Sequence, residues 1–492
     1  MAVVSQIVRW GQQAATLAAR APAPVQAAAV AGAAVVPSTQ VTLSSARAAT
    51  AAATYIDRLK PSGNLRIDAL LAGGRRWFHE PGADGSVPSA VARKTLTYSF
   101  IESADGLAAQ DANGFQALDD AQRQRVRDAL AQFSAVIDVR FEQVESGGDL
   151  KYGANVQGAS AGYARYPGEG SQVMLAANQG SFAGGWEEGT YGWQVLLHET
   201  AHAIGLKHPG NYNAGGGGTP GPYLAAADDH RNNTLMSYRN GPNMRRIVAG
   251  ENNTLSRQPV HASTLQGLDI AALQYLYGAS TTTSAGTYSW ATDAAISQTI
   301  WNPNVGTAID LSNQTKNNLI DLRPGRWSSM GIRDPYADTG FTRAQYSALT
   351  SGGRSVASVL GTPSYDGRNN LFIAKGSRVT EASGGSGNDS FVANVFGDRI
   401  AGGAGNDRVF WNGGDLSFDG GEGRDVVFVK KVQGARWSLS EDKSALTLTR
   451  TNAGTGETST LGTLSLAGIE AVRFWDGANL APVGAALYSA TA

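Results

Sequence analysis

The chain has 492 residues, a net charge of −1 and no cysteine, and it is long enough for two or three domains with sizeable cores. The missing cysteines exclude disulfides, thiolate metal sites and cysteine nucleophiles, and the balanced charge gives no sign of a nucleic-acid binder. Charged residues make up only 16% and glycine fills 61 positions, which favours turns and loops over a mainly helical protein.

Residues 1–50 are rich in alanine and carry few large apolar side chains. Such a segment has little to bury in a core, so we expect a leader or propeptide outside the folded domains. Val25–Val36 is the stretch closest to a membrane span, but it is short and weakly apolar. Met1–Gln12 lacks the compact apolar core of a secretory signal.

The next elements follow from hydrophobic spacing. Leu59–Trp77 reads as partly helical, and Thr95–Phe100 alternates as a strand does. Asp119–Val136 is predicted to be a helix, because its apolar residues recur at spacings of four, three and three. These residues are Val126, Leu130, Phe133 and Val136. Asp138–Val144 is predicted to be a strand, and further strands are expected between Gly147 and Gly180.

A second helix is predicted over Tyr191–Leu206, followed by a loop with four consecutive glycines at 215–218. A third is predicted over Leu265–Leu276. After Gly278 serine, threonine, glycine and asparagine dominate and no long helical pattern appears, so the second half is expected to be all-β. Gly278–Ala285 is the predicted domain boundary.

The segment from His198 to His208 reads HETAHAIGLKH, which fits the pattern H-E-x-x-H-x-x-G-x-x-H. Residues four apart lie one turn apart on the same helix face, so His198 and His202 can reach one ion. Gly205 permits a positive φ that ends the helix. The chain can then turn back, and His208 can supply a third ligand.

Three histidines leave a position on zinc for water, whose pKa the metal lowers toward neutrality. Glu199 lies about 100° from His198 around the helix, so it can miss the metal and reach that water. We therefore expect Glu199 to act as general base and then to protonate the leaving amine. A zinc site that has lost catalysis stays open as an alternative.

Met236 follows the histidines along the chain, within the tetrapeptide Leu235-Met236-Ser237-Tyr238. Beside the zinc motif this tetrapeptide reads as the Met-turn that lies beneath the metal, and methionine suits such a place because it is apolar and adaptable.

At these residues the chain resembles the serralysin-type metzincins, secreted zinc endopeptidases of bacteria. The resemblance covers roughly residues 55–430. It also rests on the stretches LTYSF from Leu96, HPGNYNAG from His208, DIAALQYLYG from Asp269 and IDLRPG from Ile320. It implies that Tyr238 is a further zinc ligand that swings away to hydrogen-bond the oxyanion. It also implies extracellular protein substrates, type I secretion machinery and a small protein inhibitor as partners. A monomer is expected.

Three segments fit the nonapeptide G-G-x-G-x-D-x-U-x, and they start at Gly384, Gly402 and Gly420, a constant spacing of two nonapeptides. This spacing is the signature of a calcium-binding parallel β-roll. Turn carbonyls and the aspartate carboxylate are the oxygen ligands that calcium prefers, and two to four ions are a rough expectation from that donor set. The expected ligand residues are Gly384, Ser386, Asp389, Gly402, Ala404, Asp407, Gly420, Glu422 and Asp425. The expected interior residues are Phe391, Ile400, Val409, Phe418 and Val427.

Two departures from the family leave details open. Thr283–Thr287 lacks the arginine and aspartate of the family's first calcium segment, and the chain ends Tyr488-Ser489-Ala490-Thr491-Ala492 without the family's acidic export ending. A calcium site at Thr283–Thr287 and the export route are therefore not fixed.

The predicted fold is multidomain α+β. Residues 1–50 form the leader, 51–278 form a metzincin-type α/β zinc protease domain, and 279–492 form an all-β β-roll or β-sandwich domain with its calcium core at 384–428. The predicted function is secreted, zinc-dependent endoproteolysis with a calcium-stabilised C-terminal domain. A calcium-binding surface or adhesion protein with a vestigial zinc site is the alternative.

Overall fold

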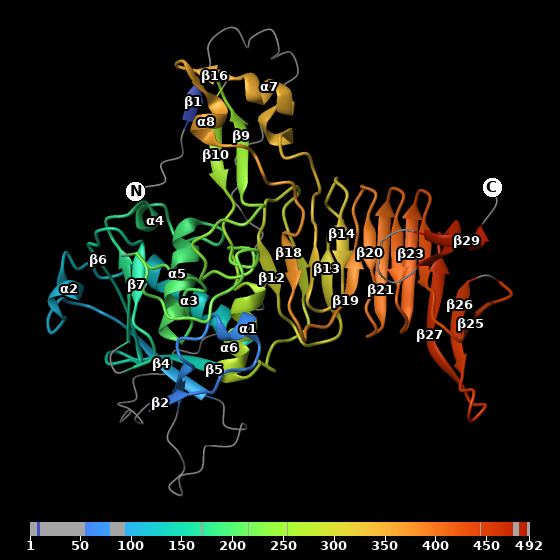
Figure 1. Ribbon diagram of the computed structural model, residues 1–492, viewed down its shortest axis with the longest axis horizontal. Helices are drawn as coiled ribbons and strands as arrows, with labels where there is room; N and C mark the ends of the chain where they lie inside the picture. The colour runs from blue at the N-terminus through green and yellow to red at the C-terminus, as the bar shows by residue number, and fades with distance from the viewer. Residues whose placement is uncertain are drawn as a thin grey trace, which may run out of the picture.

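The computed structural model describes residues 7–9, 55–78, 94–168, 171–214, 216–252, 254–442, 444–475 and 482–489. Figure 1 shows three parts: a rounded body formed by the first half of the chain, a long β-rich part that extends from it, and a small lobe that rises where the two meet. Within the described ranges, no helix combines the length and the apolar composition that a membrane crossing needs.

The body is built on a five-stranded sheet in the order β5-β4-β6-β8-β7. The strands β5, β4, β6 and β8 pair in parallel, whereas β7 is antiparallel to β8 and forms one edge of the sheet. The bounds are β4 Lys94–Phe100, β5 Val139–Gln143, β6 Leu150–Asn155, β7 Gly162–Ala164 and β8 Ser171–Ala176. The expected strands before Gly180 are therefore confirmed.

Three helices pack with this sheet into one hydrophobic core. The helix α3 (Asp120–Val136) begins at a capping box between Asp119 and Gln122 and buries the predicted apolar stripe. The helix α5 (Tyr191–Ala203) is buried at every residue from Gly192 onward, as expected for a helix that crosses the centre of a domain. The third helix is α6 (Gly267–Tyr277). All three predicted helices are confirmed, with small differences at their ends.

The prediction that Leu59–Trp77 is partly helical is confirmed, although the helical part is short. Only α1 (Leu65–Asp68) is helical, between the paired strands β2 (Tyr55–Arg58) and β3 (Arg75–Phe78). The glycines at 73 and 74 both have positive φ, and a Cβ on Gly74 would lie 2.1 Å from the carbonyl oxygen of Leu59. These glycines turn the chain back, so the apolar residues beyond them join a strand. The other short helices of the body are α2 (Ala109–Ala112) and α4 (Gly180–Ala183).

The β-rich part consists mainly of two sheets whose central strands run in parallel and alternate between the sheets along the chain. Ser390, Arg408 and Val426 are partners in neighbouring strands, and they hold the same place in successive repeats, so the predicted period is confirmed. One sheet contains β11 Thr287–Ser289, β13 Thr307–Asp310, β19 Val379–Ser383, β21 Asp398–Ala404, β23 Leu416–Glu422, β27 Thr458–Ala467, β26 Ala445–Thr451 and β25 Ala435–Leu439. The other contains β14 Leu319–Asp321, β20 Ser390–Val392, β22 Arg408–Trp411, β24 Val426–Lys430, β28 Ala471–Trp475 and β29 Pro482–Ser489.

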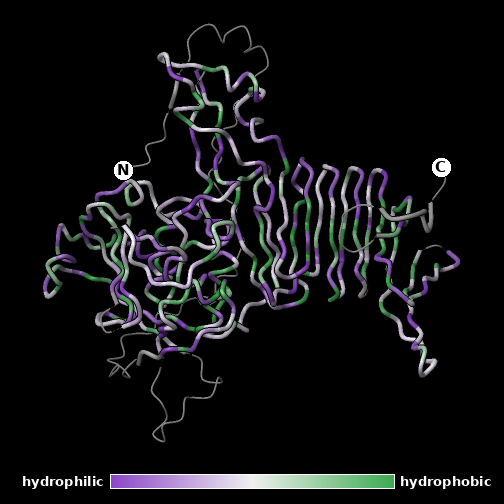
Figure 2. Tube along the Cα trace, viewed as in Figure 1, coloured by the Kyte–Doolittle hydropathy of each residue, from purple (hydrophilic) through white to green (hydrophobic). Residues whose placement is uncertain are grey.

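The interior between these sheets contains the five residues expected there. Each of Phe391, Ile400, Val409, Phe418 and Val427 is at most 2% exposed and belongs to one apolar cluster. Figure 2 shows the matching alternation of hydrophobic and hydrophilic residues along the strands. A third sheet, of β12 Gln298–Ile300, β18 Leu371–Ile373 and β15 Arg326–Ser328, lies where this part joins the body.

The expectation of an all-β second half is wrong in one place. Residues 333–365 contain η2 (Ala337–Thr339), α7 (Arg343–Ala348) and α8 (Val356–Leu360), beside the small hairpin of β16 Thr350–Ser351 and β17 Arg354–Ser355. They pack on β9 (Arg245–Gly250) and β10 (Thr254–Pro259) around a separate core of Ile247, Leu255, Tyr336, Tyr346, Val356 and Leu360. This lobe therefore combines segments that lie before and after Gly278 in the sequence. Neither segment has a long periodic pattern of apolar residues from which the lobe could be predicted.

Most of the expected leader lies outside the described residues. Its one described piece is β1 (Ile7–Arg9), which pairs antiparallel with Thr254–Ser256 of β10.

Candidate metal centre

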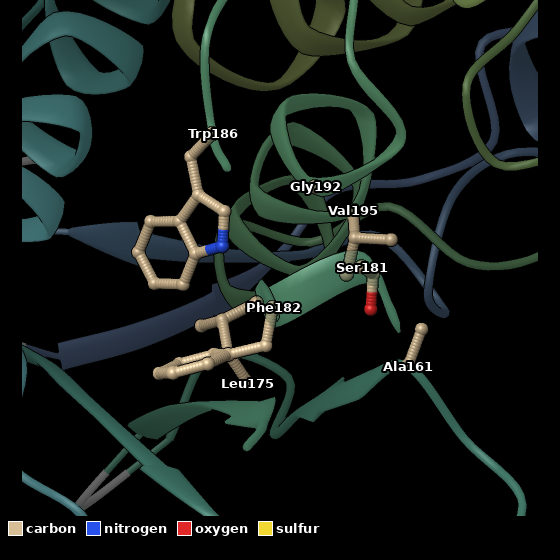
Figure 3. A pocket seen from close by; sticks show the side chains of 7 residues that line it. All are labelled: Ala161, Leu175, Ser181, Phe182, Trp186, Gly192 and Val195. Carbon is tan, nitrogen blue, oxygen red and sulfur yellow. The ribbon is translucent and has the colours of Figure 1, made fainter. Parts of the chain in front are cut away.

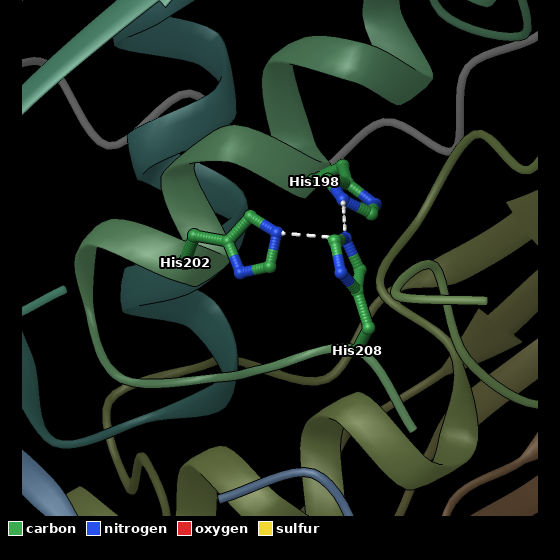
Figure 4. A group of neighbouring side chains, drawn as sticks. All are labelled: His198, His202 and His208. Carbon is green, nitrogen blue, oxygen red and sulfur yellow. Dashed lines mark hydrogen bonds between the residues drawn. The ribbon is translucent and has the colours of Figure 1, made fainter. Parts of the chain in front are cut away.

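Three histidines converge at the end of α5. His198 and His202 come from one face of the helix, and His208 comes from the loop that follows it, with the three rings turned toward one another (Figure 4). Gly205 has φ +113°, and a Cβ there would lie 2.4 Å from the carbonyl oxygen of Arg75. Glycine therefore allows the tight return that brings His208 beside the other two rings. The predicted three-histidine cluster is confirmed.

The distances between the ring nitrogens suit one tetrahedral metal ion. The Nε2 atom of His208 lies 3.1 Å from Nε2 of His198 and 3.1 Å from Nε2 of His202. Zinc–nitrogen bonds of about 2.0–2.1 Å in a tetrahedral site place two ligand nitrogens about 3.3 Å apart. Nδ1 of His198 lies 2.8 Å from the Leu235 carbonyl and Nδ1 of His202 lies 2.7 Å from the Leu206 carbonyl. Donation from Nδ1–H leaves the Nε2 lone pairs available to a metal.

Burial keeps these imidazoles neutral. It lowers the pKa of His202 to about 4 and that of His208 to about 3, and it places the pKa of His198 well below its usual range. Neutral imidazole is the form that binds metal. Burial also raises the pKa of the Glu199 carboxyl to about 8, and a nearby dication would favour its charged form. The donor set and the charge of the site both fit zinc.

Glu199 lies beneath the edge strand β7. It is 6% exposed, and a Cβ added to Gly162 would come within 2.8 Å of the Glu199 Cγ atom and 3.2 Å of its Cδ atom. The absence of a side chain at Gly162 therefore gives Glu199 its room. The same contact places the open edge of the sheet directly against the carboxylate.

We expect Gly162→Ala to lower kcat for peptide hydrolysis by about 10²-fold, because a displacement of about 1 Å in a reacting group has an effect of that size. The variant should still bind zinc, since no histidine is touched. Steady-state kinetics and metal analysis check both points. Gly158→Ala is the matched control, because a Cβ there meets no atom within 4 Å. Equal kinetics for the two variants would contradict the contact.

The turn at Met236 is held by a buried carboxylate that no motif in the sequence predicts. Asp269 of α6 accepts hydrogen bonds from the Thr234 hydroxyl (2.5 Å), the Leu235 amide (2.8 Å) and the Gln266 amide (2.9 Å). Met236 itself is fully buried. Because the Leu235 carbonyl bonds His198, Asp269 helps to position the His198 ring through a single residue, Leu235.

Asp269→Asn should destabilise the fold by about 2–4 kcal/mol, because the amide NH₂ would face donors that now reach a carboxylate. Zinc affinity should fall as well, since the Leu235 carbonyl would lose its fixed place. Chemical denaturation and a competitive zinc titration measure the two effects. Asp105→Asn, on the surface, should stay within about 0.5 kcal/mol of the wild type. An unchanged midpoint for Asp269→Asn would refute the role.

Tyr238 lies over the histidines but stays partly exposed, at 40%. Its ring centroid is 4.5 Å from that of His208 and 6.1 Å from that of His198. The Tyr212 ring stacks on Tyr238 at 5.0 Å and lies 5.7 Å from the His208 ring, and the Tyr212 hydroxyl donates to Asp229 at 2.6 Å. Tyr212 and Asp229 were not singled out from the sequence, although Tyr212 lies within a matched family segment.

The remaining histidines lie apart from this cluster. His230 contacts the Asn233 side-chain amide, and His261 lies beside Tyr191 with ring centroids 5.3 Å apart. His79 lies outside the described residues. Figure 3 shows a crevice between β8, α4 and α5, lined by Ala161, Leu175, Ser181, Phe182, Trp186, Gly192 and Val195. It has no room for a water molecule, so it is packing and not a binding site.

The aspartates of the glycine repeats are linked to one another through their backbone amides. The amide of Asp389 donates to Oδ1 of Asp407, and the amide of Asp407 donates to Oδ1 of Asp425, both at 2.7 Å. The Asp425 amide donates in turn to Glu470. Successive repeats therefore stack their acidic groups in one column.

Two oxygens of this column have no hydrogen-bond partner among the described residues. Oδ2 of Asp407 and Oδ2 of Asp425 are buried and make no hydrogen bond. A Cβ on Gly402 would lie 2.4 Å from Asp407 Oδ2 and 2.4 Å from the Gly420 carbonyl oxygen, so carboxylate and carbonyl oxygens face the same space. Burial and then the charges of Asp389 and Asp425 raise the pKa of Asp407 to about 7. Such oxygens fit a hard cation.

Comparison with known proteins agrees with this geometry. Residues 101–247 match the family Reprolysin_5, described as metallo-peptidase family M12. The chain is 31% identical to metallopeptidase AprA of Pseudomonas marginalis over 61% of this chain and 60% of that protein. It is 30% identical to metalloprotease AprA of Pseudomonas entomophila (66% and 62%) and 30% identical to serralysin C of Dickeya chrysanthemi (60% and 58%).

The chain thus spans about three fifths of the length of the curated relatives that it matches. The family match covers the strands β5, β6, β7 and β8 of the sheet, α5 and the histidine cluster, whereas β4 lies just before it. These relatives are named as metalloproteases or as a serralysin, and the chain is a relative of the serralysin-type metzincins.

Proposed function

We propose that this protein is a secreted zinc-dependent endopeptidase that hydrolyses peptide bonds of extracellular proteins. The observation that carries the proposal is the meeting of three neutral imidazole nitrogens beside the buried carboxylate of Glu199. Histidine ligands that leave a position open are typical of catalytic zinc sites. Residues 51–278 form the protease domain in this proposal, and residues 279–492 form the stabilising domain.

When bound, zinc polarises the scissile carbonyl and lowers the pKa of the attacking water. Glu199 accepts a proton from that water and donates it to the leaving amine. Tyr238, whose ring lies against His208, would be a further ligand of the zinc, and its hydroxyl would be placed to hydrogen-bond the oxyanion that develops on the substrate. The side chain of Met236 closes the floor beneath the histidines.

The edge strand β7 provides a place for an extended substrate. In the part of the chain that the structure describes, Gly162–Ala164 pairs with β8 and with no other strand, and Gly162 lies against Glu199. An extended peptide that adds to this edge through backbone hydrogen bonds brings one of its own peptide bonds to the carboxylate. Recognition through the backbone favours unfolded or flexible protein substrates.

The acidic column is proposed to hold calcium and to complete a β-roll. Its ligands are the carboxylates of Asp389, Asp407 and Asp425 with the carbonyls of Gly384, Ser386, Gly402, Ala404, Gly420 and Glu422. Ions bound between neighbouring repeats add stability only where calcium is abundant, so the domain orders after export.

The experiment is cleavage of an unfolded protein by the purified chain in calcium, with and without a zinc-selective chelator. Chelator-sensitive cleavage that zinc restores is the expected result. A folded chain with bound zinc and no cleavage of any unfolded protein would leave the vestigial-site alternative in its place.

A further inference from the structure

Arg231 lies under the turn that carries Tyr238. Its amide donates to the Arg239 carbonyl at 2.9 Å. Its side chain donates from Nε to the Ser237 carbonyl at 3.2 Å and from Nη1 to the Asn240 side-chain oxygen at 3.0 Å. The guanidinium is therefore bonded on both sides of Tyr238, the residue whose ring covers His198.

This guanidinium forms no salt bridge with a carboxylate among the described residues. Burial lowers the pKa of Arg231, and the groups that oppose this effect are the phenols of Tyr191, Tyr238 and Tyr212. Burial also lowers the pKa of His198 and of His261, and the charge of Arg231 lowers both further. Arg239, on the far side of Tyr238, contrasts with it because Arg239 is 56% exposed and pairs with Asp229 at 3.3 Å.

A partly buried cation without a counter-charge is costly unless another group supplies one. Arginine has five N–H donors, and the two side-chain bonds of Arg231 use two of them. The remaining donors suit a planar carboxylate, which arginine binds through two parallel hydrogen bonds. No described residue of the chain supplies that carboxylate, whereas a bound peptide can.

Resting on the proposed function, we propose that Arg231 selects substrates with an aspartate or glutamate within one or two residues of the cleaved bond. A residue of extended chain spans at most about 3.6 Å. A peptide whose scissile carbonyl lies at the histidine cluster therefore brings its neighbouring side chains to the turn at Tyr238. The enzyme is then a protease with an acidic preference.

The test uses pairs of short quenched-fluorescence peptides, in which one peptide has Asp and the other has Asn at the same position. Separate pairs place this difference at each of the three positions on either side of the cleaved bond. The wild type should cleave the Asp peptide with kcat/KM roughly tenfold to a hundredfold higher at one position, as expected for hydrogen bonds to a charged group. Arg231→Gln should bring that ratio to about one while zinc content stays the same.

Two variants separate recognition from support of the turn. Arg231→Lys keeps the charge but loses the Nε bond to Ser237, so it should keep more of the Asp preference than Arg231→Gln. Arg239→Gln should leave the wild-type ratio unchanged. A wild-type ratio near one at every position overturns the proposal, and so does an Arg231→Gln variant that lowers both rates equally.

If Arg231→Gln does not fold, the Asp-to-Asn ratio of kcat/KM for the wild type and for Arg231→Lys still tests the proposal. Failure to cleave any peptide would count against the proposed protease function instead. Cleavage without an acidic preference would count against Arg231 alone.

Discussion

Glu199→Gln is expected to lower kcat for peptide hydrolysis by at least ~10³-fold, since a positioned general base contributes up to about 10⁴. Glutamine keeps the shape of the side chain beside Gly162 but cannot accept the proton of the attacking water. Burial raises the pKa of the Glu199 carboxyl to about 8 without metal, so a neutral group is tolerated there. The variant should therefore fold and bind one zinc ion per chain as the wild type does.

Stopped-time cleavage assays and metal analysis on the same preparation measure both quantities. Glu145→Gln, an exposed glutamate far from the cluster in the sequence, is the control and should keep its activity. Retention of more than about a tenth of the wild-type rate by Glu199→Gln would assign the base to another group.

Calcium should stabilise the β-rich part by about 2 kcal/mol for each bound ion at a free concentration near 50 Kd. The physical reason is the column of Asp389, Asp407 and Asp425, in which like charges from successive repeats are buried together with two unpartnered oxygens. Thermal unfolding followed by far-UV circular dichroism, in calcium and in chelator, measures the shift.

The double variant Asp407→Asn with Asp425→Asn distinguishes stabilisation by bound calcium from the stability of the metal-free fold. It should lose most of the calcium effect, yet in chelator it should be at least as stable as the wild type, because two buried charges are gone. Glu457→Gln, exposed in the hairpin between β26 and β27, should behave as the wild type in both conditions. A double variant that still gains the full calcium shift would place the ions elsewhere.

The free energy of unfolding in the absence of calcium should depend on pH in a definite direction. The pKa of Asp407 rises from its ordinary 3.8 to about 7 on folding, so the folded protein binds more protons than the unfolded chain between these values. Stability in chelator should therefore fall as pH rises from about 4 to about 7. In calcium this part of the trend should vanish or reverse, since the ion replaces the proton.

The sequence was most informative where one short motif determines both local structure and chemistry. The spacing of His198, His202 and His208 predicted the cluster, because helix periodicity and one glycine turn are enough to place three rings around a point. The period of two nonapeptides predicted the strand register of the β-rich part for a similar reason. Each repeat adds one pair of strands, so position in the repeat determines which side chains face inward.

Contacts between distant segments could not be read in this way. Asp269 supports His198 from a different helix, and Glu470 continues the acidic column from outside any repeat. The lobe joins residues 245–259 to residues 333–365, neither of which has a periodic apolar face long enough to predict. Arg231 has no motif around it, and only the fold shows that no carboxylate of the described residues forms a salt bridge with it.

The most direct test of the account is a zinc titration of the metal-free protein in calcium, with the initial rate of cleavage of an unfolded protein measured at each addition. The account predicts a rate near zero without zinc and a linear rise that ends at one zinc ion per chain. Cleavage by the metal-free protein, or full zinc binding at the histidines without any rise in rate, would contradict it.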